Sequence, residues 1–280
     1  MAAFTYQRAS SVDDAVNALA ASGGSAKVIA GGMSLLPLMK LRLADPGTLI
    51  DIGRLSELRA MGPTTDGGFE VGALVTYADL LESTVIGISR ECIEGIGDVQ
   101  VRNRGTVGGA LSHADPASDL PALALALDYS FVLRSTRGER TVPSDGFFTG
   151  AFQTAMAPDE LFIKGRRPAL PAGTGGAYRK LANPASGYSI VGVAAVVAMS
   201  GGSVSHARVA LTGVGEVAYR AKAVEAALLG SDGSAAAVAA ASEHAADGQT
   251  VNSDIHADRD YRTRMAAVYT RRAIDAALGR

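Results

Sequence analysis

The chain has 280 residues, of which 48% are apolar, so it is long enough to bury a core and predicts about two domains. Its 26 basic and 28 acidic side chains give a net charge of −2, which argues against nucleic acid as a partner. The single cysteine, Cys92, excludes an internal disulfide and an iron–sulfur cluster held by this chain alone. No apolar run reaches the roughly 20 residues of a spanning helix, and the first residues lack a signal-peptide pattern, so we expect a cytoplasmic protein without a membrane span.

The first 60 residues alternate between strand and helix patterns. Apolar residues from Val12 to Leu19 repeat with helical spacing after a cap at Ser10 or Ser11, and Gly23-Gly24 ends this helix. The other predicted elements are strands at 4–6, 27–30 and 48–52 and a helix at 35–43. A glycine turn therefore joins the second strand to the second helix.

The next segment mixes sheet and helix. Its predicted elements are strands at 69–75, 131–133, 141–142 and 161–163, a helix at 77–81 and a helix from Asp119 to about Leu127. Residues 101–119 contain glycine, proline and asparagine interruptions and little periodicity, which predicts an extended functional loop.

Residues 168–176 have almost no packing side chains and are predicted to form a linker, so we place a domain boundary there. Beyond it, the sequence predicts a hairpin of strands at 188–199 and 204–212. Helical patterns follow at 217–229, 234–246 and 258–278.

Two glycine-rich turns stand out, at residues 30–34 and 105–109. Glycine lets a ligand approach the backbone, and successive N–H groups at such turns form sites for anions such as a pyrophosphate. The simpler interpretation is that each double glycine only makes a tight turn. The dinucleotide pattern fails at Met33 and Leu36, where it needs glycine, and the Walker pattern fails at Ala110-Leu111, where it needs Gly-Lys.

Few other residues indicate chemistry. The four histidines are too far apart for a local metal site, and no nucleophile accompanies His113, so we predict neither a metal nor a catalytic residue. Arg102 and Arg104 flank the second turn and could balance phosphate charge, although exposed arginines are common. Asp119 could equally be the acidic residue that favours a helix N-terminus.

Several short motifs, in their order and spacing, resemble one family. They are Ala30-Gly31-Gly32-x-Ser34-Leu35, Arg104-Gly105-Thr106-Val107-Gly108-Gly109, Ala114-Asp115-Pro116-x-x-Asp119, Ala177-Tyr178-Arg179-Lys180, Gly187-Tyr188-Ser189-Ile190-Val191-Gly192-Val193-Ala194 and Tyr261-Arg262. This set is similar to the FAD-binding medium subunit of molybdenum hydroxylases, the family of the carbon monoxide dehydrogenase medium chain and the xanthine dehydrogenase FAD subunit. The resemblance covers essentially the whole chain.

The resemblance implies an α+β fold. A vanillyl-alcohol-oxidase-type (PCMH-type) FAD-binding domain would occupy residues 1–175, in two α+β subdomains at about 1–60 and 61–175. A C-terminal α+β domain with a small antiparallel sheet and helices would occupy residues 176–280.

The resemblance also implies an FAD site. Backbone N–H groups of the two turns would enclose the pyrophosphate and neighbouring groups, at Ile29, Ala30, Gly31, Gly32, Met33, Ser34 and Leu35 and at Thr106, Val107, Gly108, Gly109 and Ala110. Asp119 would accept a hydrogen bond from the cofactor, and Ile96 and Leu161 or Phe162 would line its apolar parts. Lys180 would lie near the flavin, and Tyr188 would lie close to the isoalloxazine unless it is only a core strand residue. Met33 stands where relatives often carry histidine, glutamine or asparagine, so no side-chain hydrogen bond is expected there.

By this resemblance the chain is the FAD-carrying electron-transfer subunit of a molybdenum hydroxylase complex. A small partner subunit would hold two [2Fe–2S] clusters, a large partner would hold molybdopterin, and electrons would leave through FAD to an external acceptor. We expect a dimer of such heterotrimers. The alternatives are a stand-alone flavin reductase of the same fold and a non-catalytic scaffold subunit without flavin.

Overall fold

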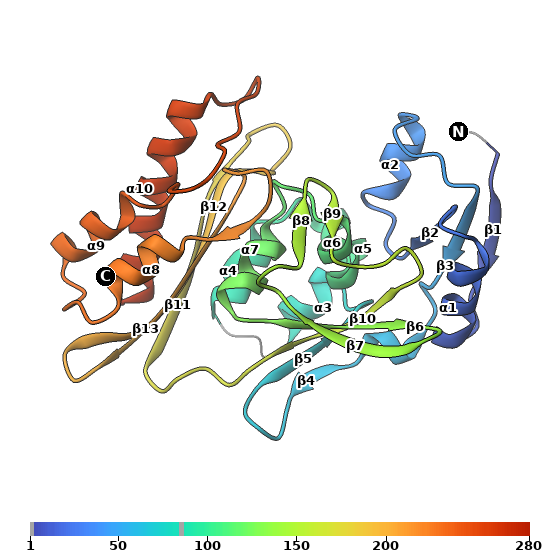
Figure 1. The fold of residues 1–280 in the computed structure, drawn as a ribbon, viewed down its shortest axis with the longest axis horizontal. Coiled ribbons are helices and arrows are strands. Elements are labelled where there is room, and N and C mark those ends of the chain that lie inside the picture. The colour runs from blue at the N-terminus through green and yellow to red at the C-terminus, as the bar shows by residue number, and fades with distance from the viewer. Residues whose placement is uncertain (1–2, 84–86) are drawn as a thin grey trace.

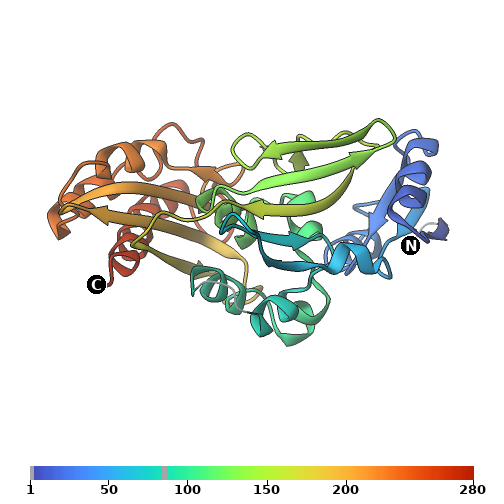
Figure 2. The ribbon, with the colours of Figure 1, turned by 90° about the horizontal axis from the view of Figure 1, so that it is seen from below.

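Three main sheets follow one another along the long axis of the molecule (Figures 1 and 2). The structure is a computed structural model that describes residues 3–83 and 87–280. The first sheet is parallel, with the strand order β1-β3-β2. Its elements are β1 (Thr5–Arg8), α1 (Val12–Ala21), β2 (Ala26–Ile29), α2 (Leu35–Lys40) and β3 (Thr48–Asp51). The predicted alternation of strand and helix is confirmed, with α2 shorter than expected.

The middle sheet is antiparallel and has the order β4-β5-β10-β6-β7. Its strands are β4 (Met61–Pro63), β5 (Phe69–Gly72), β6 (Ser130–Ser135), β7 (Gly138–Pro143) and β10 (Leu161–Arg167). The same part of the chain contains η1 (Ser56–Arg59), α3 (Tyr77–Glu82), α4 (Gly87–Glu94), α5 (Val99–Arg104), α6 (Val107–His113), α7 (Asp119–Ala126), β8 (Phe148–Gly150) and β9 (Gln153–Thr154). The pairing of β6 with β7 confirms the hairpin predicted around Gly138.

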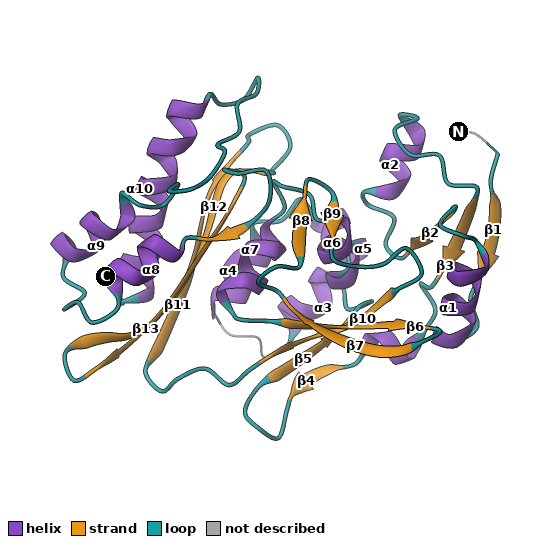
Figure 3. Cartoon of the chain, viewed as in Figure 1, coloured by secondary structure: helices purple, strands orange, loops and turns teal. Residues whose placement is uncertain are grey.

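The C-terminal sheet is antiparallel, with the order β11-β12-β13-β14. Its strands are β11 (Thr174–Ala182), β12 (Ser189–Ser200), β13 (Ser203–Thr212) and β14 (Tyr219–Arg220), followed by α8 (Lys222–Leu228), α9 (Ala235–Ser242) and α10 (Arg259–Ala277). Figure 3 shows these three helices on the side of the sheet that faces away from the middle sheet. Within the described residues, no helix is both long and apolar enough to cross a membrane.

Both faces of the C-terminal sheet are buried. On β12, Val193 and Ala195 belong to the core formed with α10, whereas Ala194 and Val196 belong to the core of the middle sheet. Successive side chains of a strand point to opposite faces, so each core receives every second residue. This explains why the apolar run at 190–199 is a strand without polar alternation.

Helix α7 lies between the middle sheet and the C-terminal sheet. All eight of its residues are buried, and it contacts β12 and β13. A helix that is apolar on every side is typically surrounded by protein on every side. The exception is Asp119, its first residue, which brings a carboxylate into the interior with 4% of its surface exposed.

The prediction of an extended loop at 101–119 is wrong, because α5 and α6 occupy most of that segment. Thr106 caps α6 by accepting a hydrogen bond from the N–H of Gly109 (3.2 Å). A Cβ on Gly108 would lie only 2.7 Å from the Cβ of Ala73, so this glycine lets α6 approach the end of β5. The glycines that suggested a loop therefore serve the packing of a helix.

The linker predicted at 168–176 is longer than the connection in the structure, because glycine at its end again belongs to a regular element. Strand β11 already begins at Thr174, and a Cβ on Gly175 would lie 1.9 Å from the carbonyl oxygen of Ala277 in α10. The glycine permits close packing of α10 on β11. The helix predicted at 217–229 is also wrong in its first part, because β14 precedes the shorter α8.

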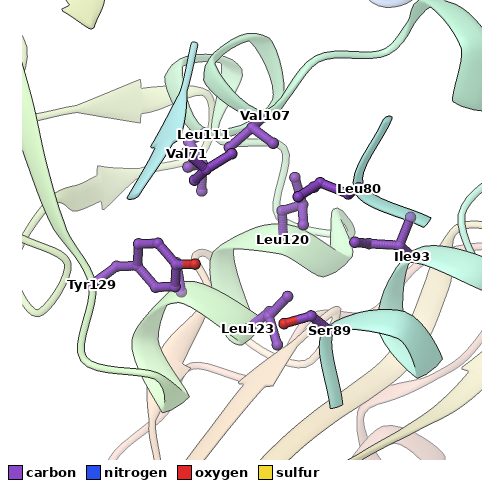
Figure 4. A pocket seen from close by; sticks show the side chains of 10 residues that line it. Val71, Leu80, Ser89, Ile93, Val107, Leu111, Leu120, Leu123 and Tyr129 are labelled. Carbon is purple, nitrogen blue, oxygen red and sulfur yellow. The ribbon is translucent and has the colours of Figure 1, made fainter. Parts of the chain in front are cut away.

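A cavity of about 40 Å³ lies among α3, α4, α6 and α7 beside the middle sheet. Its lining is mostly apolar, and Figure 4 shows the hydroxyl of Tyr129 directed toward the middle of the ring of side chains. The lining residues are Val71, Leu80, Ser89, Ile93, Val107, Leu111, Leu120, Leu123, Ala124 and Tyr129. Burial raises the pKa of Tyr129 to about 12, so this hydroxyl stays protonated at neutral pH.

Replacing Leu123 with alanine is expected to lower the free energy of unfolding by about 2–5 kcal/mol, because it enlarges this cavity within a packed core. Leu123 is 5% exposed, whereas Leu43, the control, is 72% exposed. Leu43→Ala is expected to change stability by less than about 0.5 kcal/mol. Urea denaturation followed by circular dichroism measures both, and similar losses in the two variants would contradict the assignment of Leu123 to the core.

Candidate FAD-binding cleft and interdomain junction

A cleft of about 320 Å³ opens where the two glycine turns meet. The parallel strands β2 and β3 end at the same edge of the first sheet, and the residues that follow them enter the cleft. Residues near the second turn form the opposite wall. The lining comprises Tyr6, Ile29, Ala30, Gly31, Asp51, Gly53, Arg54, Arg59, Leu74, Thr76, Asn103, Arg104 and Thr106.

The two turns touch through their backbones at Gly31. A Cβ on Gly31 would lie 1.8 Å from the carbonyl oxygen of Arg104 and 3.3 Å from the nitrogen of Gly105. Only glycine can occupy this position without pushing the turns apart. Gly32 has a φ of +75°, which also favours glycine. Glycine is therefore required at position 31 by the contact between the turns and is favoured at position 32 by the backbone conformation.

The first turn carries a row of backbone N–H groups without partners. From Gly31 to Leu35, five consecutive N–H groups donate to no backbone acceptor in the described part of the chain. Ser34, which precedes α2, makes no capping hydrogen bond with its side chain. Backbone donors normally find a partner, and successive N–H groups suit an anion with several oxygens. This turn therefore fits the diphosphate group of FAD.

The second turn differs, because most of its N–H groups serve the fold. Val107 donates to the carbonyl of Val75 (3.0 Å), Gly108 to that of Ala73 (2.9 Å) and Ala110 to that of Thr106 (3.0 Å). Gly109 donates to the hydroxyl of Thr106. The expectation that Thr106 to Ala110 all offer amide donors is therefore corrected. Among residues 106–110 of the described chain, only the N–H of Thr106 has no acceptor.

Arginines give the cleft positive charge. Arg59 is held by hydrogen bonds to the carbonyls of Gly53 (2.9 Å) and Leu74 (3.4 Å), and the exposed Arg54 and Arg104 line the same cleft. Guanidinium groups bind phosphate through paired hydrogen bonds. Arg102 is not in the lining, because its guanidinium donates to the carbonyls of Ile96 and Gly97 (both 3.0 Å).

Asp51 is the acidic group of the cleft. Its carboxylate accepts hydrogen bonds from the hydroxyl of Tyr6 and the N–H of Gly53 (2.8 Å), and Arg8 lies 3.7 Å away. Partial burial raises its pKa, but these hydrogen bonds and the charge of Arg8 outweigh burial and hold the pKa below its usual value. Asp51 is therefore ionised at neutral pH and ties β1 to the end of β3.

A second polar cluster, the Asp119 junction, joins α7 to the C-terminal sheet. The carboxylate of Asp119 accepts hydrogen bonds from the hydroxyls of Tyr178 and Ser189 (both 2.6 Å) and from the ammonium of Lys180 (2.7 Å). Lys180 also donates to the carbonyl of Gly95 (2.9 Å). Two carboxylate oxygens offer about four acceptor sites, and three of them are used within the described chain.

The other predicted site residues differ in exposure. Tyr188 is 45% exposed and immediately precedes Ser189 of the junction. Partial burial and the negative charges of Asp115 and Asp119 raise its pKa. Ile96 is partly buried. Leu161 and Phe162 are each 3% exposed, and Phe162 packs against Phe131 with ring centroids 5.4 Å apart. These two side chains present almost no free surface in this conformation.

Sequence reasoning did not single out several residues of these two sites. Tyr178 and Ser189 lie within the quoted motifs but were given no role, and Asp51, Arg54 and Arg59 were not considered. Tyr178 and Lys180 are two residues apart on one strand, a spacing that places both side chains on the same face. Arg54 follows the end of a parallel strand, where ligand sites are common. In the described residues, no group of three histidine, cysteine or acidic side chains could hold a metal ion.

The stability that ionised Asp51 contributes is expected to decline as the pH falls. Its folded pKa lies below the ordinary value of 3.8, so its contribution is complete above that pH and is lost as the pH falls through the folded pKa. Asp51→Asn lacks this titration and should show a shallower loss of stability on acidification below about pH 4. Denaturation at a series of pH values measures the difference. Parallel pH profiles of the two proteins would show that Asp51 is not stabilised in the folded state.

Comparisons with known proteins agree with this geometry. Residues 2–169 match the family of the FAD binding domain in molybdopterin dehydrogenase, and residues 176–277 match the CO dehydrogenase flavoprotein C-terminal domain. The carbon monoxide dehydrogenase medium chain of Hydrogenophaga pseudoflava is 42% identical over 99% of this chain and 98% of its own length. A subunit of the 6-hydroxypseudooxynicotine dehydrogenase complex of Paenarthrobacter nicotinovorans is 36% identical over 99% of this chain and 95% of its own.

Solved structures show the same likeness. A chain of the carbon monoxide dehydrogenase of Hydrogenophaga pseudoflava, in a form that lacks the Mo-pyranopterin moiety, superimposes with a TM-score of 0.96 and 43% identity, covering 99% of this chain and 98% of that chain. The α+β fold expected from the sequence is thereby confirmed. The chain belongs to the family of FAD-binding medium subunits of molybdopterin-dependent dehydrogenases.

Proposed function

We propose that this chain is the FAD-carrying electron-transfer subunit of a molybdenum hydroxylase complex. The observation that carries the proposal is the row of five N–H groups at the first turn that have no backbone acceptor among the described residues, beginning at Gly31 in the wall of a cleft that three arginines also line. This arrangement suits a dinucleotide diphosphate, and family membership identifies the dinucleotide as FAD. When bound, FAD supplies the redox chemistry.

The residues of this chain bind and orient the cofactor. In this proposal the N–H groups of Gly31 to Leu35 and of Thr106 hold the diphosphate, while Arg54 and Arg104 balance its charge. Ile29 and Ala30 line the cleft beside them. Ile96, Asp119, Lys180 and Tyr188 remain the residues proposed for the flavin half. The chain itself provides no catalytic residue.

The proposal includes the partners. With one cysteine, this chain cannot hold a [2Fe–2S] cluster, so a small partner subunit supplies the clusters and a large one supplies molybdopterin. The names of the relatives, a medium chain and a complex subunit, support a multi-subunit assembly. A dimer of heterotrimers, a cytoplasmic location and domain boundaries at 1–175 and 176–280 are further parts of the proposal. The hydroxylated substrate would be chosen by the large subunit.

Binding of FAD is expected to require glycine at position 31. Gly31→Ala places a Cβ against the carbonyl of Arg104 and should separate the turns, so the purified protein should lose most of its flavin absorbance. Gly62→Ala is the matched control, because a Cβ there meets no atom within 4 Å in the described structure. It should retain flavin as the wild type does. Absence of flavin from the wild type, with no uptake of added FAD, would contradict the function and favour a scaffold role.

Co-expression with the neighbouring genes is expected to yield a complex that contains this chain, molybdenum and iron. Size-exclusion chromatography with metal analysis measures its composition. The chain alone should not turn over NAD(P)H with a substrate of its own. A flavin-loaded monomer with full reductase activity would instead support the stand-alone reductase.

A further inference from the structure

The loop between α6 and α7, residues 114–118, is held by the C-terminal sheet through its backbone. The hydroxyl of Thr212 lies 2.8 Å from the carbonyl oxygens of both Pro116 and Ser118, which share its single proton. The N–H of Gly213 donates to the carbonyl of Pro116 (2.7 Å), and that of Ser189 donates to the carbonyl of Ala117 (3.2 Å). Three donor groups therefore hold this loop, in addition to the three at Asp119.

The donors on the C-terminal sheet are themselves held firmly. Arg262 of α10 is 4% exposed, and its guanidinium donates to the carbonyls of Ile190 (2.7 Å) and Gly213 (2.8 Å). Gly213 has a φ of +80°, and a Cβ there would lie 2.5 Å from the carbonyl oxygen of Ser189. The segments that bind the loop are thus connected to each other and, through Arg262, to α10.

The loop is also connected directly to the second glycine turn. Helix α6 begins at this turn with Thr106 as its cap and ends at His113, and the next residue, Ala114, has a φ of +49°. Helix α6 has seven residues, so only about two turns of helix separate the second glycine turn from the loop. Thr106 lines the cleft and Asp119 lies just beyond the loop, so the cleft and the junction share this short connection.

We propose that Asp119 is a positioning residue that couples the second glycine turn to the C-terminal sheet, so that FAD binding and the docking of this sheet stabilise each other. The inference rests on the proposed function. Its physical basis is that a buried carboxylate is stable only with its donors in place, so Tyr178, Lys180 and Ser189 must stay docked. Coupling of two equilibria is reciprocal: a ligand that orders the turn strengthens docking by the same factor.

Asp128, at the other end of α7, provides a matched control. Its carboxylate pairs with Arg208 (2.7 Å) and Arg220 (3.6 Å), so it too joins this helix to the C-terminal sheet. Asp128 follows α7 and is not in the loop that continues from α6. Its φ of +49° suits asparagine, so Asp128→Asn removes the charge without backbone strain.

The test compares Tyr178→Phe and Ser189→Ala with Asp128→Asn in the full chain. The first two variants remove donors of the junction but leave the Asp119 carboxylate and its charge in the chain. We expect each to weaken FAD binding by about tenfold, the effect of one buried hydrogen bond, and Asp128→Asn to stay within about twofold of the wild type. Titration of the FAD-depleted protein, followed by flavin fluorescence, measures the affinities.

Hydrogen exchange with and without FAD separates coupling from a merely structural role. In the wild type, FAD should increase the protection of β11 and of the start of β12, and this increase should be reduced in Tyr178→Phe and Ser189→Ala but kept in Asp128→Asn. If Tyr178→Phe fails to fold, Ser189→Ala alone decides the result. Wild-type affinity and unchanged FAD-dependent protection in the junction variants would overturn the coupling while leaving the FAD function intact. A wild type that binds no FAD would overturn the proposed function and the coupling with it.

Discussion

The contact between Gly31 and the carbonyl of Arg104 is the constraint on which the cleft depends. Because a Cβ would lie 1.8 Å from that oxygen, the distance between the two turns is set by the absence of a side chain. The second turn is in turn anchored by hydrogen bonds to Val75 and Ala73, next to the middle sheet. In the described structure the first turn leaves its own N–H groups without backbone partners, and its position follows from packing against the second turn. The two turns differ in what they offer a ligand: the first has five N–H groups without backbone acceptors, and the second has that of Thr106 among residues 106–110 of the described chain.

A similar division exists between the two ends of α7. The helix is buried along its whole length, so its packing supplies apolar contact with both flanking sheets but no specific orientation. Orientation comes from the carboxylates at its ends, Asp119 and Asp128, each paired with a basic residue of the C-terminal sheet. The buried pair of Asp119 and Lys180 contributes little net stability but disfavours any docking that leaves its charges unpaired, whereas the pair at Asp128 is partly exposed. The C-terminal sheet is thus held in one position relative to the cleft.

The sequence predicted the regular elements well where apolar periodicity was strong, as in α1 and the β12–β13 hairpin. The prediction was wrong where glycine can indicate either a flexible segment or a close contact between two segments. Gly108 and Gly175 were interpreted as signs of a loop and a linker, yet both lie in regular elements where another backbone or side chain comes too close for a Cβ. Close approach between segments far apart in the chain is a tertiary property, so no local pattern distinguishes it from flexibility. The family resemblance identified the site motifs, but it could not show which N–H groups the fold already uses.

Binding through backbone N–H groups explains why Met33 is compatible with the site. The first turn offers backbone N–H groups, and a donor that every residue except proline possesses does not depend on the side chain at that position. The side chain of Met33 is 39% exposed and does not line the cleft. Glycine is needed at position 31 because of contact and at position 32 because of backbone conformation, whereas position 33 is free of both requirements. Binding through the backbone therefore permits different side chains at position 33 of the motif.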